Sequence, residues 1–264
     1  MLLAAYALGL LLLGAAVGVI SAAIGLGGGI VMVPAFLTFI PGMDAHTAKG
    51  TSLFIILFVA LANAWRLNRG LPEKPWRMAA AMSCGSLLGG YAGAWITARM
   101  SEAAVVWIFV AFLGLLAVRT FFLQTPAVGA EAVRPRHALA ALIGVVSGLV
   151  GGATGTGGGV VLVPLALLTG CACNARVVGL SNMVMVVTSA AGSIAHFLAQ
   201  PVYAGSWTVG QVWLPLVPLV FLGAQMGSPY GVRLNARLSL RRRRWVLGAV
   251  LAAVAARMLI RALS

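Results

Sequence analysis

The chain has 264 residues, of which 61% are hydrophobic and only 8% are charged, and its formal net charge at pH 7 is +14. Soluble domains carry about 25% charged residues, so this composition excludes an ordinary soluble protein. Continuous apolar runs, in place of alternating apolar and polar residues, also exclude a membrane β-barrel.

Ten apolar segments are predicted, five in each half of the chain. They cover residues 2–24, 28–40, 45–65, 77–97 and 103–123, then 137–154, 158–170, 175–198, 207–231 and 242–261. Most approach the roughly 20 residues that a helix needs to span the hydrocarbon. The first is interpreted as a membrane helix and not a signal peptide, because no basic residues precede it. The sequence therefore predicts an all-α, polytopic, multi-pass membrane protein.

A glycine-rich motif occurs once in each half. Residues 25–34 read GLGGGIVMVP and residues 155–164 read GTGGGVVLVP, with seven of ten positions identical. Each motif precedes a short second segment, which is predicted to be a half-helix or a re-entrant leg. Paired broken helices are typical of carriers built from two repeats. We therefore predict a first transmembrane repeat at 1–125, a cytoplasmic linker at 126–136 and a second repeat at 137–264.

A second duplicated pattern lies in the fourth segment of each half. Glycines recur every fourth position at Gly85, Gly89 and Gly93, and again at Gly223, Gly227 and Gly231. Small residues at this spacing form a groove along one helix face. The pattern predicts close helix packing.

Basic residues orient the chain, because cytoplasmic loops are enriched in Lys and Arg. The loop 66–77, the linker and the stretch 233–244 are basic and are predicted to be cytoplasmic, whereas the uncharged loop 199–206 is predicted to be external. The two halves are then inverted repeats, with both termini outside. Most tryptophans fall near segment ends, as in an interfacial aromatic belt. The arginines are attributed to orientation and lipid contact, so no nucleic-acid partner is expected.

The glycine clusters are the main candidate ligand site. Gly27, Gly28 and Gly29 in one half, and Gly157, Gly158 and Gly159 in the other, precede predicted helix starts. The first N–H groups of a helix have no intrahelical acceptor and can bind an anion. The alternative is that the glycines only allow tight helix crossing.

Polar side chains near these clusters are further candidates. They are Thr51, Ser52, Thr154, Thr156, Ser181 and Asn182. They could bind an oxyanion or bond back to a helix carbonyl. His46 and Arg176 occupy matched positions and are expected either at the mouth of the site or at lipid head groups. Asp44 and Asn174 are also matched and are predicted to be helix N-caps.

Charge inside the predicted membrane segments is scarce. The four acidic residues lie at segment ends or in loops, so no carboxylate is expected to couple transport to protons or sodium. His196 is the main candidate for a coupling group, although a histidine near a helix end is more often interfacial. The three cysteines suggest no metal site. No metal, no cofactor and no catalytic residues are expected.

With its paired glycine–proline motifs, duplicated apolar halves and length, the chain resembles the sulfite exporter TauE/SafE family. The resemblance implies a carrier in the bacterial inner membrane that exports sulfite or a small organosulfonate. The expected partners are this small anion and membrane lipids, and the sequence leaves the oligomeric state open, a homo-oligomer included. One difference is that residues 180–182 read LSN where residues 50–52 read GTS, so the halves need not contact the ligand equally.

The main alternative is a channel, or a carrier for a different small anion such as a carboxylate or another oxyanion. The sequence offers no ring of polar positions that would line a continuous pore. An enzyme is not expected, because none of the common nucleophile, metal-ligand or paired-acid motifs is present. A purely structural scaffold would leave the duplicated glycine breaks unexplained.

Overall fold

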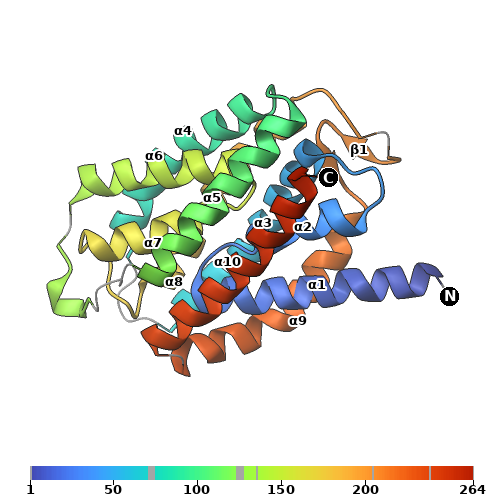
Figure 1. The fold of residues 1–264 in the computed structure, drawn as a ribbon. Coiled ribbons are helices and arrows are strands. Elements are labelled where there is room, and N and C mark those ends of the chain that lie inside the picture. Colours follow the sequence, from blue (N-terminus) through green and yellow to red (C-terminus); the bar gives the residue numbers. More distant parts are fainter. Residues whose placement is uncertain are drawn as a thin grey trace.

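The computed structural model describes residues 2–70, 75–122, 128–134, 136–203, 205–237 and 239–263. These residues form ten α-helices (Figure 1). The first five are α1 (Leu2–Ile24), α2 (Gly29–Phe39), α3 (Ala45–Asn68), α4 (Trp76–Thr97) and α5 (Glu102–Phe122). The others are α6 (His137–Thr154), α7 (Gly159–Leu168), α8 (Val177–Phe197), α9 (Leu216–Arg237) and α10 (Leu240–Leu263). A 3₁₀ turn covers Ala130–Ala132, and strands β1 (Thr208–Val209) and β2 (Val212–Trp213) form an antiparallel hairpin.

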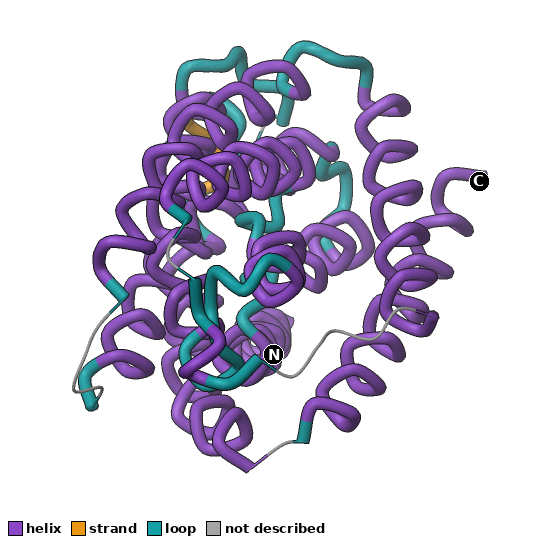
Figure 2. Tube along the Cα trace, turned by 90° about the vertical axis from the view of Figure 1, so that its left-hand side faces the viewer, coloured by secondary structure: helices purple, strands orange, loops and turns teal. Residues whose placement is uncertain are grey.

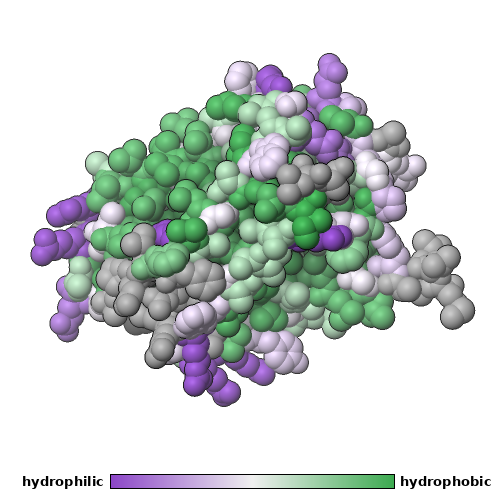
Figure 3. Space-filling view, viewed as in Figure 1, coloured by the Kyte–Doolittle hydropathy of each residue, from purple (hydrophilic) through white to green (hydrophobic). Residues whose placement is uncertain are grey.

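The prediction of a polytopic all-α membrane protein is confirmed. Five stretches within the described residues are long and apolar enough to cross a bilayer, and they belong to α1, α3, α5, α6 and α8. Apolar residues cover much of the face in Figure 3, with hydrophilic residues gathered at its edges. Such a surface is unfavourable in water but suits the hydrocarbon of a membrane.

The start of the ninth predicted segment is wrong. Residues 208–213 form the β-hairpin, and α9 begins only at Leu216. Trp207 and Gly210 have φ angles of 66° and 56°, in the left-handed region that interrupts a helix. Pro215 then directly precedes the helix, where its missing N–H costs nothing. Hydrophobicity did not reveal the turn, because the hairpin contains apolar residues, as does the helix that follows.

The second predicted segment of each half is a short helix. α2 has 11 residues and α7 has 10. At 1.5 Å per residue each is roughly 15 Å long, about half the thickness of the hydrocarbon core. Neither helix can therefore cross a bilayer by itself.

Helices from the two halves pack against each other in matched pairs. α1 lies along α9, and α4 lies along α6, which is the same pairing with the halves exchanged. α3 packs on α8, and α5 packs on α10 at the front of Figure 1. In the view turned by 90°, the helices form one bundle (Figure 2). The division at the linker and the opposite insertion of the halves stay predictions.

α3 and α8 run antiparallel. Gly50 lies next to His196, Leu53 contacts Gly192, and Asn68 contacts Gly179. Positions that advance along α3 therefore meet positions that go back along α8. The beginning of α3 and the end of α8 lie together, beside the β-hairpin.

The glycine-spaced helices are packing surfaces, as predicted. A Cβ added to Gly85, Gly89 or Gly93 of α4 would overlap carbonyl oxygens of α6. Additions at Gly223, Gly227 and Gly231 of α9 would overlap carbonyl oxygens of α1 in the same way. The absence of side chains lets these backbones approach closely, which is a common means of helix association in membranes.

Candidate functional site

Two glycine loops join the long and short helices of each half. Loop 25–28 connects α1 to α2, and loop 155–158 connects α6 to α7. The φ angle is positive at the first, third and fourth positions of both loops. Side chains rarely adopt this conformation, so glycine is needed at these positions for backbone reasons alone.

The two loops lie directly against each other at the centre of the molecule. A Cβ on Gly29 would overlap the carbonyl oxygen of Gly155, and a Cβ on Gly159 would overlap that of Gly25. Residues 25–30 and 154–160 are all buried. The tight packing predicted as the alternative role of the glycines is therefore present.

Side chains from the third helix of each half fix the loop of the other half. Ser52 Oγ of α3 donates a hydrogen bond of 2.9 Å to Gly155 O, and Ser181 Oγ of α8 donates one of 3.0 Å to Gly25 O. The two bonds are equivalent: each joins the third helix of one half to the first glycine of the loop in the other half. Their geometry brings the N-terminal ends of α2 and α7 together.

The N-terminal ends of these short helices retain unused donors. The first helical hydrogen bonds come from Val31 and Met32 to Gly28 O, and from Val161 and Leu162 to Gly158 O. Within the described part of the chain, the backbone N–H groups of Ile30 and Val160 have no backbone acceptor. Such donors, reinforced by the positive end of the helix dipole, can hold an anion.

Most of the polar candidates bond to the protein in this structure. Thr51 Oγ1 accepts a hydrogen bond from Trp213 N at 2.9 Å, and Asn182 Nδ2 donates to Val178 O. Thr154 Oγ1 donates to Val150 O and lies 2.9 Å from Thr156 Oγ1. Thr154 and Thr156 thus lie at the second glycine loop with structural partners, whereas Thr51 is bonded to the β-hairpin.

The predicted pair of N-caps is only half correct. Asp44 Oδ1 accepts hydrogen bonds from His46 N and Thr47 N, which makes Asp44 the N-cap of α3. Asn174 is not the N-cap of α8, because that helix starts at Val177. The Asn174 side chain instead accepts a hydrogen bond from Val128 N and ties the preceding loop to the linker.

The two histidines near the ends of α3 and α8 are buried. His196 is completely inaccessible, which contradicts an interfacial position. Its Nδ1 lies 2.7 Å from Gln211 Oε1, while its Nε2 has no partner among the described residues. His46 is also buried, and its Nδ1 is likewise unpartnered within the same part of the chain. Arg176, its counterpart in the second half, is half-buried at the start of α8.

Lys49 is a residue that the sequence interpretation missed. Its side chain lies inside α3 and is only 1% exposed. The carbon chain runs against Gly155, and Nζ donates a hydrogen bond of 3.3 Å to Ala153 O. A lysine within an apolar segment is rare and usually functional, and that signal was available in the sequence.

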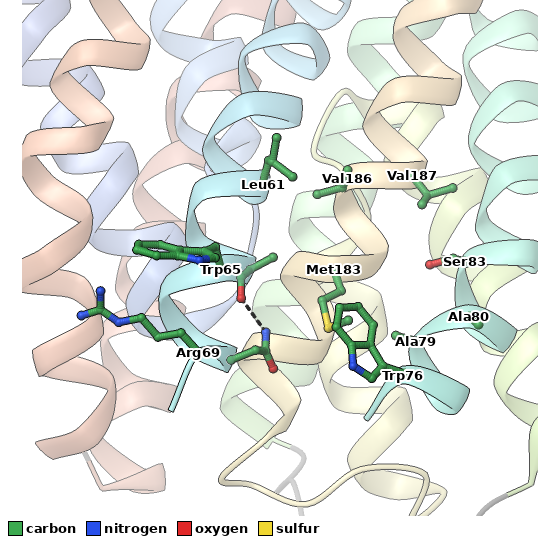
Figure 4. A pocket seen from close by; sticks show the side chains of 12 residues that line it. Leu61, Trp65, Arg69, Trp76, Ala79, Ala80, Ser83, Met183, Val186 and Val187 are labelled. Carbon is green, nitrogen blue, oxygen red and sulfur yellow. Dashed lines mark hydrogen bonds between the residues drawn. The ribbon is translucent and has the colours of Figure 1, made fainter. Parts of the chain in front are cut away.

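One cavity of about 520 Å³ lies between α3, α4 and α8 (Figure 4). Trp65 and Arg69 border it on α3, where the Arg69 guanidinium stacks 5.0 Å from the Trp65 ring centre. Trp76 and Met183 border it on the other side. Its lining is mainly apolar and includes no residue of the glycine loops. The glycine loops therefore form a site distinct from this cavity.

The fold and the site define a polytopic helical membrane protein in which two buried half-helices meet end to end. The profile of the family described as sulfite exporter TauE/SafE matches residues 10–258. The chain belongs to this family and is a membrane transporter.

Curated relatives agree with that class. A probable membrane transporter protein of Haemophilus influenzae is 26% identical over 95% of both chains. One from Methanocaldococcus jannaschii is 23% identical, covering 95% of this chain and 94% of its own. A third, YunE of Bacillus subtilis, is 26% identical over 86% of this chain and 89% of its own. No solved structure matches the chain.

Proposed function

We propose that this transporter exports a small sulfur-containing anion, sulfite or a small organosulfonate, across the inner membrane of a bacterium. The observation that carries the proposal is the meeting of the α2 and α7 N-termini, each packed against the glycine loop of the other half. The description of the matching family as sulfite exporters supports the substrate class. No enzymatic step, metal or cofactor is part of the proposal.

The anion is held between the halves, by backbone N–H groups at the two helix ends. A half-helix N-terminus carries about half a positive charge, so two ends together favour a singly charged ligand. The loops are fully buried here, so in this conformation the proposed site is closed to both sides of the membrane. Transport then requires one half to move relative to the other, as in other carriers with paired broken helices.

Export of an anion can be driven by the membrane potential. An inside-negative potential of 100 mV contributes about 2.3 kcal/mol for each negative charge expelled. Proteoliposomes loaded with sulfite should therefore export it faster when the inside is made negative with a potassium gradient. Export that is independent of the imposed potential would contradict a uniport of charged anion.

The direct test is ligand-dependent thermal stabilisation of the detergent-purified protein. The panel consists of sulfite, sulfate, thiosulfate, small sulfonates and carboxylates at equal ionic strength. A ligand present at 100 times its Kd adds about 2.7 kcal/mol to the folded state, so a true substrate raises the unfolding temperature clearly. Selective stabilisation by sulfite or a sulfonate supports the proposal. Stabilisation by none of the anions contradicts it.

A carrier or channel for another small anion, such as a carboxylate, is the second candidate. Backbone N–H groups bind oxyanions of several kinds, and the helix ends contain nothing specific for sulfur. The same panel separates the substrates. Flux that rises without saturation would favour a channel over a carrier. Both candidate functions are compatible with a monomer or a homo-oligomer in the lipid bilayer.

A further inference from the structure

Buried polar atoms without partners gather at one corner of the α3–α8 interface. On α8, Ser189 Oγ, Ser193 Oγ and His196 Nε2 have no hydrogen-bond partner among the described residues. Their spacing places them on one helix face. Ser189 also lies next to Gly157, so the polar face starts at the second glycine loop and leads toward the β-hairpin.

Lys49 faces the same corner from α3. His196 lies within electrostatic range of Lys49 and of His46, and Gly50, the next residue, lies beside the His196 side chain. Within the described residues, Nζ uses one of its three donors, on Ala153 O. A buried ammonium group is costly unless an anion or several acceptors accompany it.

The corresponding position in the other half has no charge. Lys49 packs against Gly155, and Val178 packs against Gly25 in the matched place. The two glycine loops are alike in backbone geometry, so this difference makes the site one-sided. The first loop packs in the same way against an uncharged residue, Val178. Packing alone therefore does not explain why a lysine lies next to the second loop.

We propose that Lys49, Ser193 and His196 form a subsite that binds a small oxyanion together with a proton, beside the second glycine loop. The inference rests on the proposed function and names the residues that neutralise the substrate. Lys49 supplies the positive charge, and Ser193 donates from its hydroxyl group. His196 takes a proton that stays on the protein when the anion leaves, so the exported anion keeps its charge.

The tautomer of His196 follows from its neighbour in the hairpin. Gln211 Nε2 donates to Ala98 O at 3.4 Å and to Gln200 O at 3.3 Å, so Oε1 is the atom turned toward the histidine. An amide oxygen can only accept, and therefore the proton is on Nδ1 of His196 and the lone pair is on Nε2. Nε2 can accept a proton when an anion enters, and the imidazolium then donates to it.

Asp44 is the carboxylate that acts electrostatically on Lys49, and its Oδ2 has no hydrogen-bond partner among the described residues. Asp44 and Glu102 act on His46 electrostatically. Asp44 Oδ1 is engaged by the first N–H groups of α3, and Glu102 Oε1 accepts from Ala45 N. Asp44 therefore balances part of the charge of Lys49, whereas no carboxylate of the described residues acts on His196, so the anion itself balances the protonated histidine.

The test measures binding of methanesulfonate and sulfite to the full-length purified protein by titration calorimetry. Methanesulfonate carries no proton at neutral pH, so protons taken up on binding belong to the protein. Lys49→Met should weaken binding about tenfold or more, because a charge-assisted hydrogen bond is lost, and Lys49→Arg should restore part of it. Arg69→Met removes an exposed cation near the apolar cavity and should leave affinity unchanged.

Stability separates a binding role from a structural one. Lys49→Met should unfold at the same or a higher temperature than the wild type, because it removes a buried charge. Lower stability with unchanged affinity would overturn the subsite while leaving the proposed function intact. If the wild type binds neither anion, both proposals fail.

Calorimetry in two buffers of different ionisation enthalpy tests the proton. The wild type should take up a proton with methanesulfonate, and His196→Gln should bind without uptake. His46→Gln is the matched control and should retain the uptake. Binding by the wild type with no proton uptake would overturn the role of His196, and uptake that is lost only in His46→Gln would do the same.

Discussion

The hydroxyl group of Ser52 donates a hydrogen bond of 2.9 Å to the carbonyl oxygen of Gly155, across 103 residues of sequence. This bond fastens the glycine loop of the second half to the third helix of the first. The bond from Ser181 to Gly25 does the same in the opposite sense. Each half therefore supplies a hydrogen-bond donor to a loop carbonyl of the other half, at the place where the anion is proposed to bind.

Removing these hydroxyls should lower stability. Ser52→Ala and Ser181→Ala each leave a buried carbonyl without its donor, and each is expected to cost about 0.5–2 kcal/mol. Thermal unfolding in detergent measures the loss. Ser193→Ala is the control, because its hydroxyl has no partner in the described structure, and it should leave the unfolding temperature nearly unchanged. Equal effects at all three positions would contradict this assignment.

A single methyl group between the loops should disturb the fold. Gly29→Ala and Gly159→Ala keep a helical backbone conformation but would overlap the facing carbonyl oxygens. The halves must separate slightly, at an expected cost of about 1–3 kcal/mol. Gly114→Ala, in α5, has open space around it and should be neutral or mildly stabilising. Wild-type unfolding temperatures for Gly29→Ala and Gly159→Ala would show that the loops do not touch.

Larger side chains at the helix ends should abolish transport while the protein still inserts into the membrane. A side chain at Gly28 would overlap Val17 of α1, and one at Gly158 would overlap the carbonyl oxygen of Ser147 in α6, so Gly28→Val and Gly158→Val displace the starts of α2 and α7. Gly42→Val is the matched control, since Gly42 also has a positive φ, of 73°, but nothing lies near its added Cβ. Sulfite flux in proteoliposomes is the measurement. Normal flux in both loop variants would exclude the glycine loops as the site.

The N-cap of α3 should contribute to stability independently of transport. Asp44→Ala removes the acceptor for two N–H groups and is expected to cost about 0.5–2 kcal/mol, whereas Asp44→Asn should retain most of the cap. Asn174→Ala acts through the contact with Val128 and not through a cap. Far-lower transport in Asp44→Asn at normal stability would instead indicate a proton-carrying role for the carboxylate.

Opposite insertion of the two halves can be tested by cysteine labelling in intact cells. Single cysteines at exposed positions 70 and 201 are introduced into a variant that lacks the native cysteines. The charge distribution predicts that Pro201→Cys reacts with a membrane-impermeant maleimide from outside, and that Gly70→Cys reacts only after permeabilisation. Reaction of both from the same side would exclude inverted repeats.

The length of continuous apolar runs predicted the helices well where a helix is uniformly apolar. Nine of the ten predicted segments agree with the observed helices to within three residues at each end. The error at 207–215 arose because hydrophobicity alone cannot distinguish a buried hairpin from the start of a helix. The cap assigned to Asn174 failed for a related reason, since the repeat preserved the position but not the start of the helix.

The sequence by itself determined the membrane class, the repeated glycine motif and the short helices, because these depend on local properties: apolar length, glycine conformation and motif spacing. Only the tertiary structure decided which partners the polar groups have. Ser52 and Ser181 bond to loops more than 100 residues away, and Gly50 lies beside His196 because α3 and α8 run antiparallel. Such contacts arise from packing between distant segments, and a single sequence contains no direct record of them.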